Sequence, residues 1–109
     1  MARHTSADRV TEHEVADAVC KALATEAGRE ASIQKLVLEV PNFLKLSAAD
    51  LAQSPTRKNE ALWEQQIRNI QSHHVSPGNF IHEGFLESTK GGLRLTDAGV
   101  RRLEEKGLI

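Results

Sequence analysis

The stretch from Gly84 to Gly99 constrains the fold of this chain more than any other part of the sequence. Two short strand-like runs, 85–88 and 93–95, flank the sequence Thr-Lys-Gly-Gly at 89–92, and these glycines can supply the positive φ that a tight β-hairpin needs. Thr96 follows with a side-chain oxygen that can begin a new helix. Because a two-stranded ribbon cannot bury enough surface to be stable alone, we expect the hairpin to pack against the helices that precede it.

Capping residues and hydrophobic spacing predict helices on both sides of the hairpin. Thr11 with Glu14 and Ser47 with Asp50 match capping boxes. Ser32 can cap the helix that follows the first one, and Pro41 ends that helix. In order, the predicted elements are a helix over 12–27 with Gly28 as its stop, a very short strand at 31–32, a helix over 33–40, a short helix from 48 to about 53, a helix over 60–74, an extra turn over 79–83, the hairpin and a final helix over 97–106.

This order predicts an α+β, mostly helical fold: a winged helix-turn-helix with a small two- to three-stranded antiparallel sheet. The 109 residues are enough for one domain with a single core. We expect residues 1–10 to form a flexible N-terminus and residues 11–109 to form the domain. Since winged helices are used mainly to hold nucleic acid, the domain is predicted to bind DNA.

The composition narrows the possible partners and location. No segment approaches the roughly 18 apolar residues of a membrane span, and the N-terminus has no apolar signal-peptide core. We therefore expect a cytoplasmic protein without a membrane partner. The single cysteine, Cys20, rules out an internal disulfide and a multi-cysteine zinc site.

The formal net charge of −1 argues mildly against a nonspecific DNA coater. However, residues 54–109 hold eight Lys or Arg against seven Asp or Glu, whereas residues 1–53 hold six against eight. The second half can therefore build a locally positive face.

The predicted helix over 60–74 is the candidate recognition helix. A helix fits the major groove, where Arg reads guanine and Asn or Gln reads adenine through paired hydrogen bonds. The alternative is an ordinary solvated face, which the adjacent basic loop and hairpin disfavour. The candidate base-contacting side chains are Gln65, Arg68, Asn69, Gln71, Ser72 and His73.

Basic residues on both sides of this helix are candidates for contacts to DNA phosphates. Arg57, Lys58 and Asn59 directly precede it, where backbone N–H groups and the positive end of the helix dipole also favour a phosphate. Lys90 at the hairpin tip and Arg94 on the second strand could reach the flanking backbone or minor groove. Taken alone, each group is explained equally well as solvated surface.

The sequence predicts no catalytic centre, no metal site and no cofactor. His73, His74 and His82 lack an acidic or thiol partner at ligand spacing. The run Glu104-Glu105-Lys106 is typical of surface charge on a terminal helix. A phosphate-binding Gly-rich motif and a nucleophile with an evident base are also missing. We therefore expect a noncatalytic protein without a small-molecule substrate.

Part of the chain resembles the N-terminal winged-helix domain of Mrr-type restriction endonucleases. The resemblance covers about two-thirds of the chain, and it implies the specificity domain of a nuclease whose catalytic domain lies in a longer parent chain. The matching positions mostly keep the fold: Glu30-Ala31-Ser32-Ile33, Leu46-Ser47-Ala48-Ala49-Asp50-Leu51, Trp63 with Ile67, Gly84-Phe85-Leu86-Glu87, and Leu95-Thr96-Asp97-Ala98-Gly99.

One departure from that family suggests the kind of target. The family usually runs from the third helix almost directly into the glycine before the hairpin, whereas residues 73–80 intervene here. With Arg68-Asn69 and Ser72-His73, this segment is similar to winged-helix modules of modification-dependent restriction systems, including DpnI-type readers of N6-methyladenine. The resemblance implies that the domain inspects a methylated base in duplex DNA.

Reading N6-methyladenine would make specific chemical demands. The methyl group lies in the major groove and leaves one N–H donor, so a reader needs an amide or carbonyl acceptor beside a small apolar recess. Asn69, Gln65 and Asn79 are the candidates for that acceptor.

Taken together, these patterns predict a noncatalytic module that binds a specific site in double-stranded DNA through the helix at about 60–74. Two alternatives remain open. One is a dimeric winged-helix transcriptional regulator in which the first or the terminal helix mediates dimerisation. The other is a winged helix that only contacts proteins, which the near-neutral charge favours.

Overall fold

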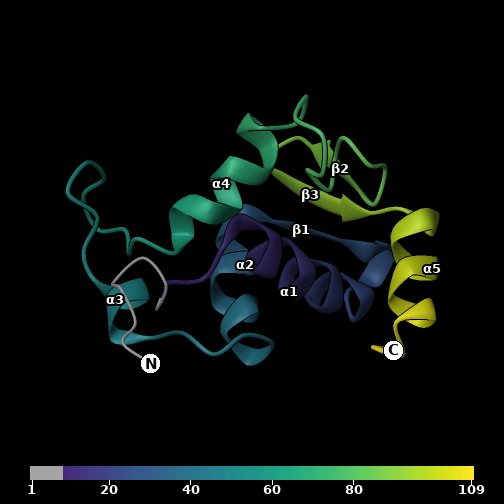
Figure 1. The fold of residues 1–109 in the computed structure, drawn as a ribbon, viewed down its shortest axis with the longest axis horizontal. Helices are drawn as coiled ribbons and strands as arrows, with labels where there is room; N and C mark the ends of the chain where they lie inside the picture. The colour runs from purple at the N-terminus through teal and green to yellow at the C-terminus, as the bar shows by residue number, and fades with distance from the viewer. Residues whose placement is uncertain (1–8) are drawn as a thin grey trace.

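The computed structural model describes residues 9–109 as an α+β fold with five α-helices and a small antiparallel sheet. Figure 1 shows α1 at the centre, the sheet along one side of it, and α5 at the opposite end of the molecule from α3. The predicted α+β class and small antiparallel sheet are confirmed. The elements are α1 (Glu12–Ala24), the 3-10 turn η2 (Ala27–Arg29), β1 (Glu30–Ser32), α2 (Ile33–Glu39), the 3-10 turn η3 (Val40–Asn42), α3 (Ala48–Leu51), α4 (Glu64–Ser72), β2 (Leu86–Thr89), β3 (Gly92–Leu95) and α5 (Asp97–Glu105).

The three strands form one sheet in the order β1-β3-β2. The very short strand expected at 31–32 is β1, and it pairs with β3 through Ala31 opposite Leu93. The hairpin, residues 86–95, pairs β2 with β3 throughout its length. Its second strand is therefore bound on both edges, once within the hairpin and once to β1.

Two adjacent glycines at the hairpin tip have different roles. Gly91 has φ +78° and is the second residue of the two-residue turn, as the sequence predicts. Gly92 does not supply a positive φ, so that part of the prediction is wrong. Its strand passes so close to β1 that an added Cβ would lie 2.1 Å from the carbonyl oxygen of Ala31. The Ile33 amide also donates to the Gly91 carbonyl at 3.0 Å, which ties the tip to the start of α2.

Helix α1 forms the centre of the hydrophobic core. It packs against α4, α5 and β3, and burial raises the pKa of its Cys20 thiol to about 12. Its buried side chains are Val15, Ala16, Ala18, Val19, Cys20, Ala22 and Leu23.

The helix starts follow their predicted caps. The capping boxes of Thr11 with Glu14 and of Ser47 with Asp50 both form, and Ser32 and Thr96 cap α2 and α5. The side chain of Asp50 is almost fully buried.

The flexible segment expected at 1–10 is only partly described, because residues 1–8 lie outside the described part of the chain. Val10 contradicts that expectation, since it is buried. Its amide donates to Asp50 Oδ1 at 2.8 Å, and its carbonyl accepts from Gln66. The packed domain therefore begins before residue 11.

Two helix boundaries differ from the prediction by three or more residues. Helix α1 ends at Ala24, and Gly28 adopts its positive φ in the turn that follows rather than at the helix end. Helix α4 begins at Glu64 rather than at 60, because residues 60–62 bond to the backbone at 52–54 instead of continuing a helix. None of the helices within 9–109 is both long and apolar enough to cross a membrane.

Candidate nucleic-acid interface

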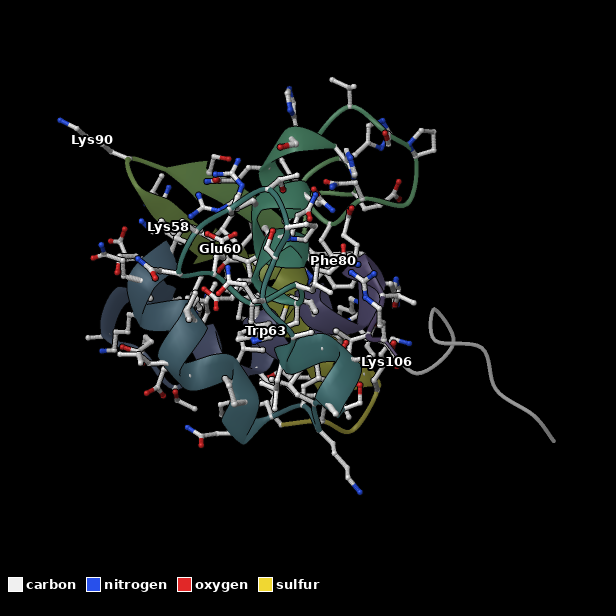
Figure 2. All side chains as sticks on the ribbon, turned by 90° about the vertical axis from the view of Figure 1, so that its left-hand side faces the viewer. Lys58, Glu60, Trp63, Phe80, Lys90 and Lys106 are labelled. Atoms are coloured by element: carbon white, nitrogen blue, oxygen red, sulfur yellow. The ribbon has the colours of Figure 1, made fainter. Side chains whose placement is uncertain are left out.

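Helix α4 has one buried face and one exposed polar face. Ile67 and Ile70 are fully buried, whereas Gln65, Arg68 and Ser72 are exposed at the spacing of a single helix face. The helical spacing of polar and apolar residues therefore predicts correctly which side of α4 is exposed. Figure 2 views the molecule from the side on which α4 stands upright, with Trp63 in the interior near its base.

The exposed face of α4 carries an ion pair that the sequence did not predict. Arg68 donates from Nε and Nη2 to the carboxylate of Glu60, with distances of 2.9 to 3.2 Å. This hydrogen bonding raises the pKa of Arg68, so the guanidinium remains charged. Glu60 is buried while Arg68 stays partly exposed. No periodic pattern links positions 60 and 68, because Glu60 lies outside the helix.

The basic loop, residues 54–59, is ordered by its own hydrogen bonds. Gln53 Nε2 donates to the carbonyls of Arg57 and Glu60 at 2.8 and 3.2 Å, and Ser54 Oγ accepts from the Arg57 amide. Asn59 has φ +63°, a conformation that Asn tolerates better than most residues. The loop therefore presents Lys58 from a fixed backbone.

The predicted phosphate site at the start of the recognition helix is not formed as expected. Arg57, Lys58 and Asn59 are separated from the first residue of α4 by the segment 60–63. Glu64 also places its carboxylate on the Ala61 amide at 3.0 Å, which occupies a donor that a phosphate would need. Arg57 also forms an ion pair within the chain, since its Nε lies 3.9 Å from Glu60 Oε1. Lys58, by contrast, forms no ion pair with any residue in the described range 9–109.

Three further polar side chains of α4 form hydrogen bonds, two of them within the helix and one to the hairpin. Asn69 Nδ2 donates to Gln66 Oε1 at 3.0 Å, and Ser72 Oγ donates back to the Arg68 carbonyl at 3.2 Å. Gln71 Nε2 donates to the Gly92 carbonyl at 3.0 Å. Gln71 thus fixes the hairpin against α4, which is a positioning role rather than the base contact expected from the sequence.

Asn79 is not available to read a base, so its assignment to the DNA interface is wrong. It is 5% exposed, and its Nδ2 donates to Glu12 and to the Ile70 carbonyl at 3.1 and 3.0 Å. Its Oδ1 accepts from the amides of Ile81 and His82 at 2.8 and 3.1 Å. All of its hydrogen-bonding capacity is used to hold residues 79–82 against α1 and α4.

His73 contacts Glu12, the same acidic residue that accepts a hydrogen bond from Asn79. Its Nδ1 lies 2.5 Å from Glu12 Oε1, although the ring is half exposed. One carboxylate at the start of α1 therefore binds both His73 and Asn79, just past the end of α4. The sequence contains no local pattern that links residue 12 to residues 73 and 79.

The two predicted cations of the hairpin differ in availability. Arg94 pairs with Glu87 directly across the β2–β3 ladder, so its charge is largely balanced within the hairpin. Lys90 is exposed at the tip and forms no ion pair with another described residue. In Figure 2, Lys90 points away from the tip into solvent, on the same side of α4 as Lys58, whereas Lys106 lies on the other side.

The three histidines considered as metal ligands, His73, His74 and His82, each contact another group of the protein. Among residues 9–109, no group of three or more His, Cys, Asp or Glu side chains could hold a metal ion. His74 contacts the Gln71 carbonyl and His82 contacts Glu83.

Comparisons with protein-family models, with curated proteins and with solved structures found no significant match to this chain.

Proposed function

We propose that this domain is a noncatalytic module that binds double-stranded DNA as a winged helix, with α4 as the recognition helix. The element order supports this reading: α1, β1, α2, α4 and the β2–β3 hairpin follow the winged helix-turn-helix order, with α3 as an addition before α4. The hydrogen bond from Gln71 to the Gly92 carbonyl holds the hairpin beside α4.

One observation carries the proposal. Two cations that form no ion pair within residues 9–109, Lys58 on the basic loop and Lys90 on the hairpin tip, lie on the same side of α4 in the view of Figure 2. Phosphate contacts position a protein on the duplex, and base-edge contacts specify the sequence. Lys58 and Lys90 are suited to the first role, and Gln65 and Arg68 to the second.

The proposed target remains a specific and methylated site, read by a module that serves a nuclease domain in a longer parent chain. Of the three acceptors considered for N6-methyladenine, Asn79 is eliminated by its buried hydrogen bonds. Gln65 is exposed and forms no side-chain hydrogen bond within the described chain. Asn69 uses its Nδ2 on Gln66 and leaves its Oδ1 as an acceptor.

The test is a duplex-binding panel of fully methylated, hemimethylated and unmodified oligonucleotides at several salt concentrations. We expect Lys90→Ala to weaken all duplexes similarly and to lower the salt slope, because each phosphate contact accounts for roughly a threefold change in affinity between 50 and 200 mM salt. Lys106→Ala, which removes a charge on the other side of the molecule (Figure 2), is the matched control and should change nothing. A folded wild-type protein that binds no duplex even at low salt would refute the proposal.

A second candidate, a winged helix that contacts protein, is favoured by an apolar groove. The groove has a volume of about 540 Å³ and is lined by residues from α2 to the start of α4, including Leu44, Leu51 and Trp63. Leu51 is 58% exposed at its edge. Light scattering tests whether the partner is a second copy of this chain. A concentration-dependent dimer that Leu51→Lys abolishes would support self-association through the groove. A monomer at every concentration would exclude self-association.

A further inference from the structure

Glu60 holds the guanidinium of Arg68 in one pose. Arg68 Nε lies 3.1 and 3.2 Å from the two carboxylate oxygens, and Nη2 lies 2.9 Å from Oε2. The Glu60 side chain is 10% exposed and that of Arg68 is 44% exposed. The acceptor is therefore the buried partner, and the guanidinium is the group that reaches the surface.

Glu60 is itself fixed by its backbone. Its carbonyl accepts from the Ser54 amide at 2.8 Å and from Gln53 Nε2 at 3.2 Å. The carboxylate therefore projects from the closed end of the basic loop rather than from a mobile segment. Arg68 in turn stands on α4, so both partners are anchored by regular hydrogen bonding.

The ion pair leaves a defined set of donors on Arg68. A guanidinium has five N–H groups in a rigid planar fork. The edge formed by Nε and Nη2 is bound to Glu60, so the edge formed by Nη1 and Nη2 is turned away from it with two donors side by side. Guanine offers two adjacent acceptors in the major groove, O6 and N7, whereas adenine places its N6 donor beside N7. The Nη1–Nη2 edge of Arg68 therefore matches the two acceptors of guanine, whereas at adenine one of its donors would face the N6 donor.

The pairing also argues against a phosphate as the partner. The carboxylate balances most of the charge that would attract a phosphate, while the directed N–H donors remain. Lys58 and Lys90 are unpaired within residues 9–109 and are the better phosphate ligands.

We propose that Arg68, positioned by Glu60, selects guanine at one position of the duplex site. Nη1 and Nη2 of Arg68 donate to the O6 and N7 acceptors of that base. This inference rests on the proposed DNA-binding function, and it adds a base identity and a positioning residue to it.

The experiment is selection of duplexes from a random pool at stated salt, followed by affinity measurements on the selected site. Wild type is compared with Arg68→Ala, Arg68→Lys and Glu60→Gln, and with Arg101→Ala on α5 as a charge-matched control. Arg68→Lys keeps the charge but loses the fork. The preference for guanine is measured as the affinity ratio between two duplexes that differ at one position, and this ratio does not depend on the fraction of protein that is folded.

We expect a selected site with one guanine preferred roughly 5- to 150-fold over other bases. Both Arg68 variants should lose this preference, Glu60→Gln should reduce it, and Arg101→Ala should retain it. Replacing the guanine by 7-deazaguanine, which lacks the N7 acceptor, should weaken wild type but not Arg68→Ala.

Other outcomes separate the two proposals. If no duplex is selected, the DNA-binding function itself fails. If a site is selected and the Arg68 variants keep its base preferences, or lose affinity equally for every sequence, DNA binding stands and the guanine assignment is overturned. If Glu60→Gln lowers the melting temperature without changing the base ratio, Glu60 is only a structural residue and its positioning role is refuted.

Discussion

Replacing Gly92 with alanine tests whether β1 holds the hairpin in place beside α4. An added Cβ would lie 2.1 Å from the Ala31 carbonyl oxygen and 2.9 Å from Ser32 Cα, whereas ordinary van der Waals contact begins at 3.4 Å. Both neighbours are backbone atoms and cannot rotate away. Strands β1 and β3 must therefore separate locally, which also strains the hydrogen bond from Gln71 to the Gly92 carbonyl.

The magnitude follows from these contacts. Overpacking costs about 1–3 kcal/mol, and each weakened hydrogen bond adds about 1 kcal/mol. We expect Gly92→Ala to lower the free energy of unfolding by about 2–4 kcal/mol. Gly91→Ala is the matched control, because an added Cβ meets nothing within 4 Å there and only the positive φ of +78° is strained. That strain costs about 1–2 kcal/mol.

Thermal and urea unfolding followed by circular dichroism measure the difference. For a domain of this size, 1 kcal/mol corresponds to roughly 4 °C in Tm. Gly92→Ala should therefore lower Tm by about 8–16 °C and Gly91→Ala by about 4–8 °C. Equal losses, or a larger loss for Gly91→Ala, would refute the idea that close approach to β1 fixes the hairpin.

Two further predictions concern polar side chains that join separate elements of the fold. Asn79→Ala should lower the free energy of unfolding by about 2–3 kcal/mol, because it leaves the Ile70 carbonyl and two amides without partners; a changed base preference in a stably folded variant would contradict this structural role. The second concerns the pKa of Asp17, which burial alone would raise but which the hydrogen bond and charge of Arg102, with Lys21, hold below its usual 3.8. The stabilisation is thus fully present above pH 3.8 and is lost as the pH falls through the lowered value. Asp17→Asn should cost about 1–3 kcal/mol at neutral pH, and its deficit relative to wild type in unfolding measurements should shrink below pH 3.8; a deficit independent of pH would contradict the assignment.

Much of the fold could be predicted because it depends on short-range chemistry. The caps at Thr11, Ser32 and Thr96 form as their side chains indicate, since a cap needs only a backbone amide three residues away. The hairpin follows from two strand-like runs around a glycine turn. The buried face of α4 follows from the helical spacing of its isoleucines.

The candidate site was harder to predict because long-range partners decide which side chains are free. Residues on one polar stretch looked equivalent in the sequence, yet Asn79 is consumed by buried hydrogen bonds and His73 by a carboxylate at residue 12. The segment before α4 was expected to extend that helix. Backbone pairing with residues 52–54 stops it, and this pairing could not be seen from local propensity.

The sequence by itself determined the order of the helices and strands and the inward face of α4, because capping, turn geometry and hydrophobic periodicity are properties of neighbouring residues. Only the tertiary structure decided the electrostatics. Arg68 and Arg94 are paired with Glu60 and Glu87, whereas Lys58 and Lys90 are left without a described partner. Such ion pairs depend on distances across the fold: Arg94 and Glu87 are seven positions apart in the chain, whereas Arg102 and Asp17 are 85 apart. For that reason the basic residues could be counted from the sequence, but those left without a described ion-pair partner could not be identified.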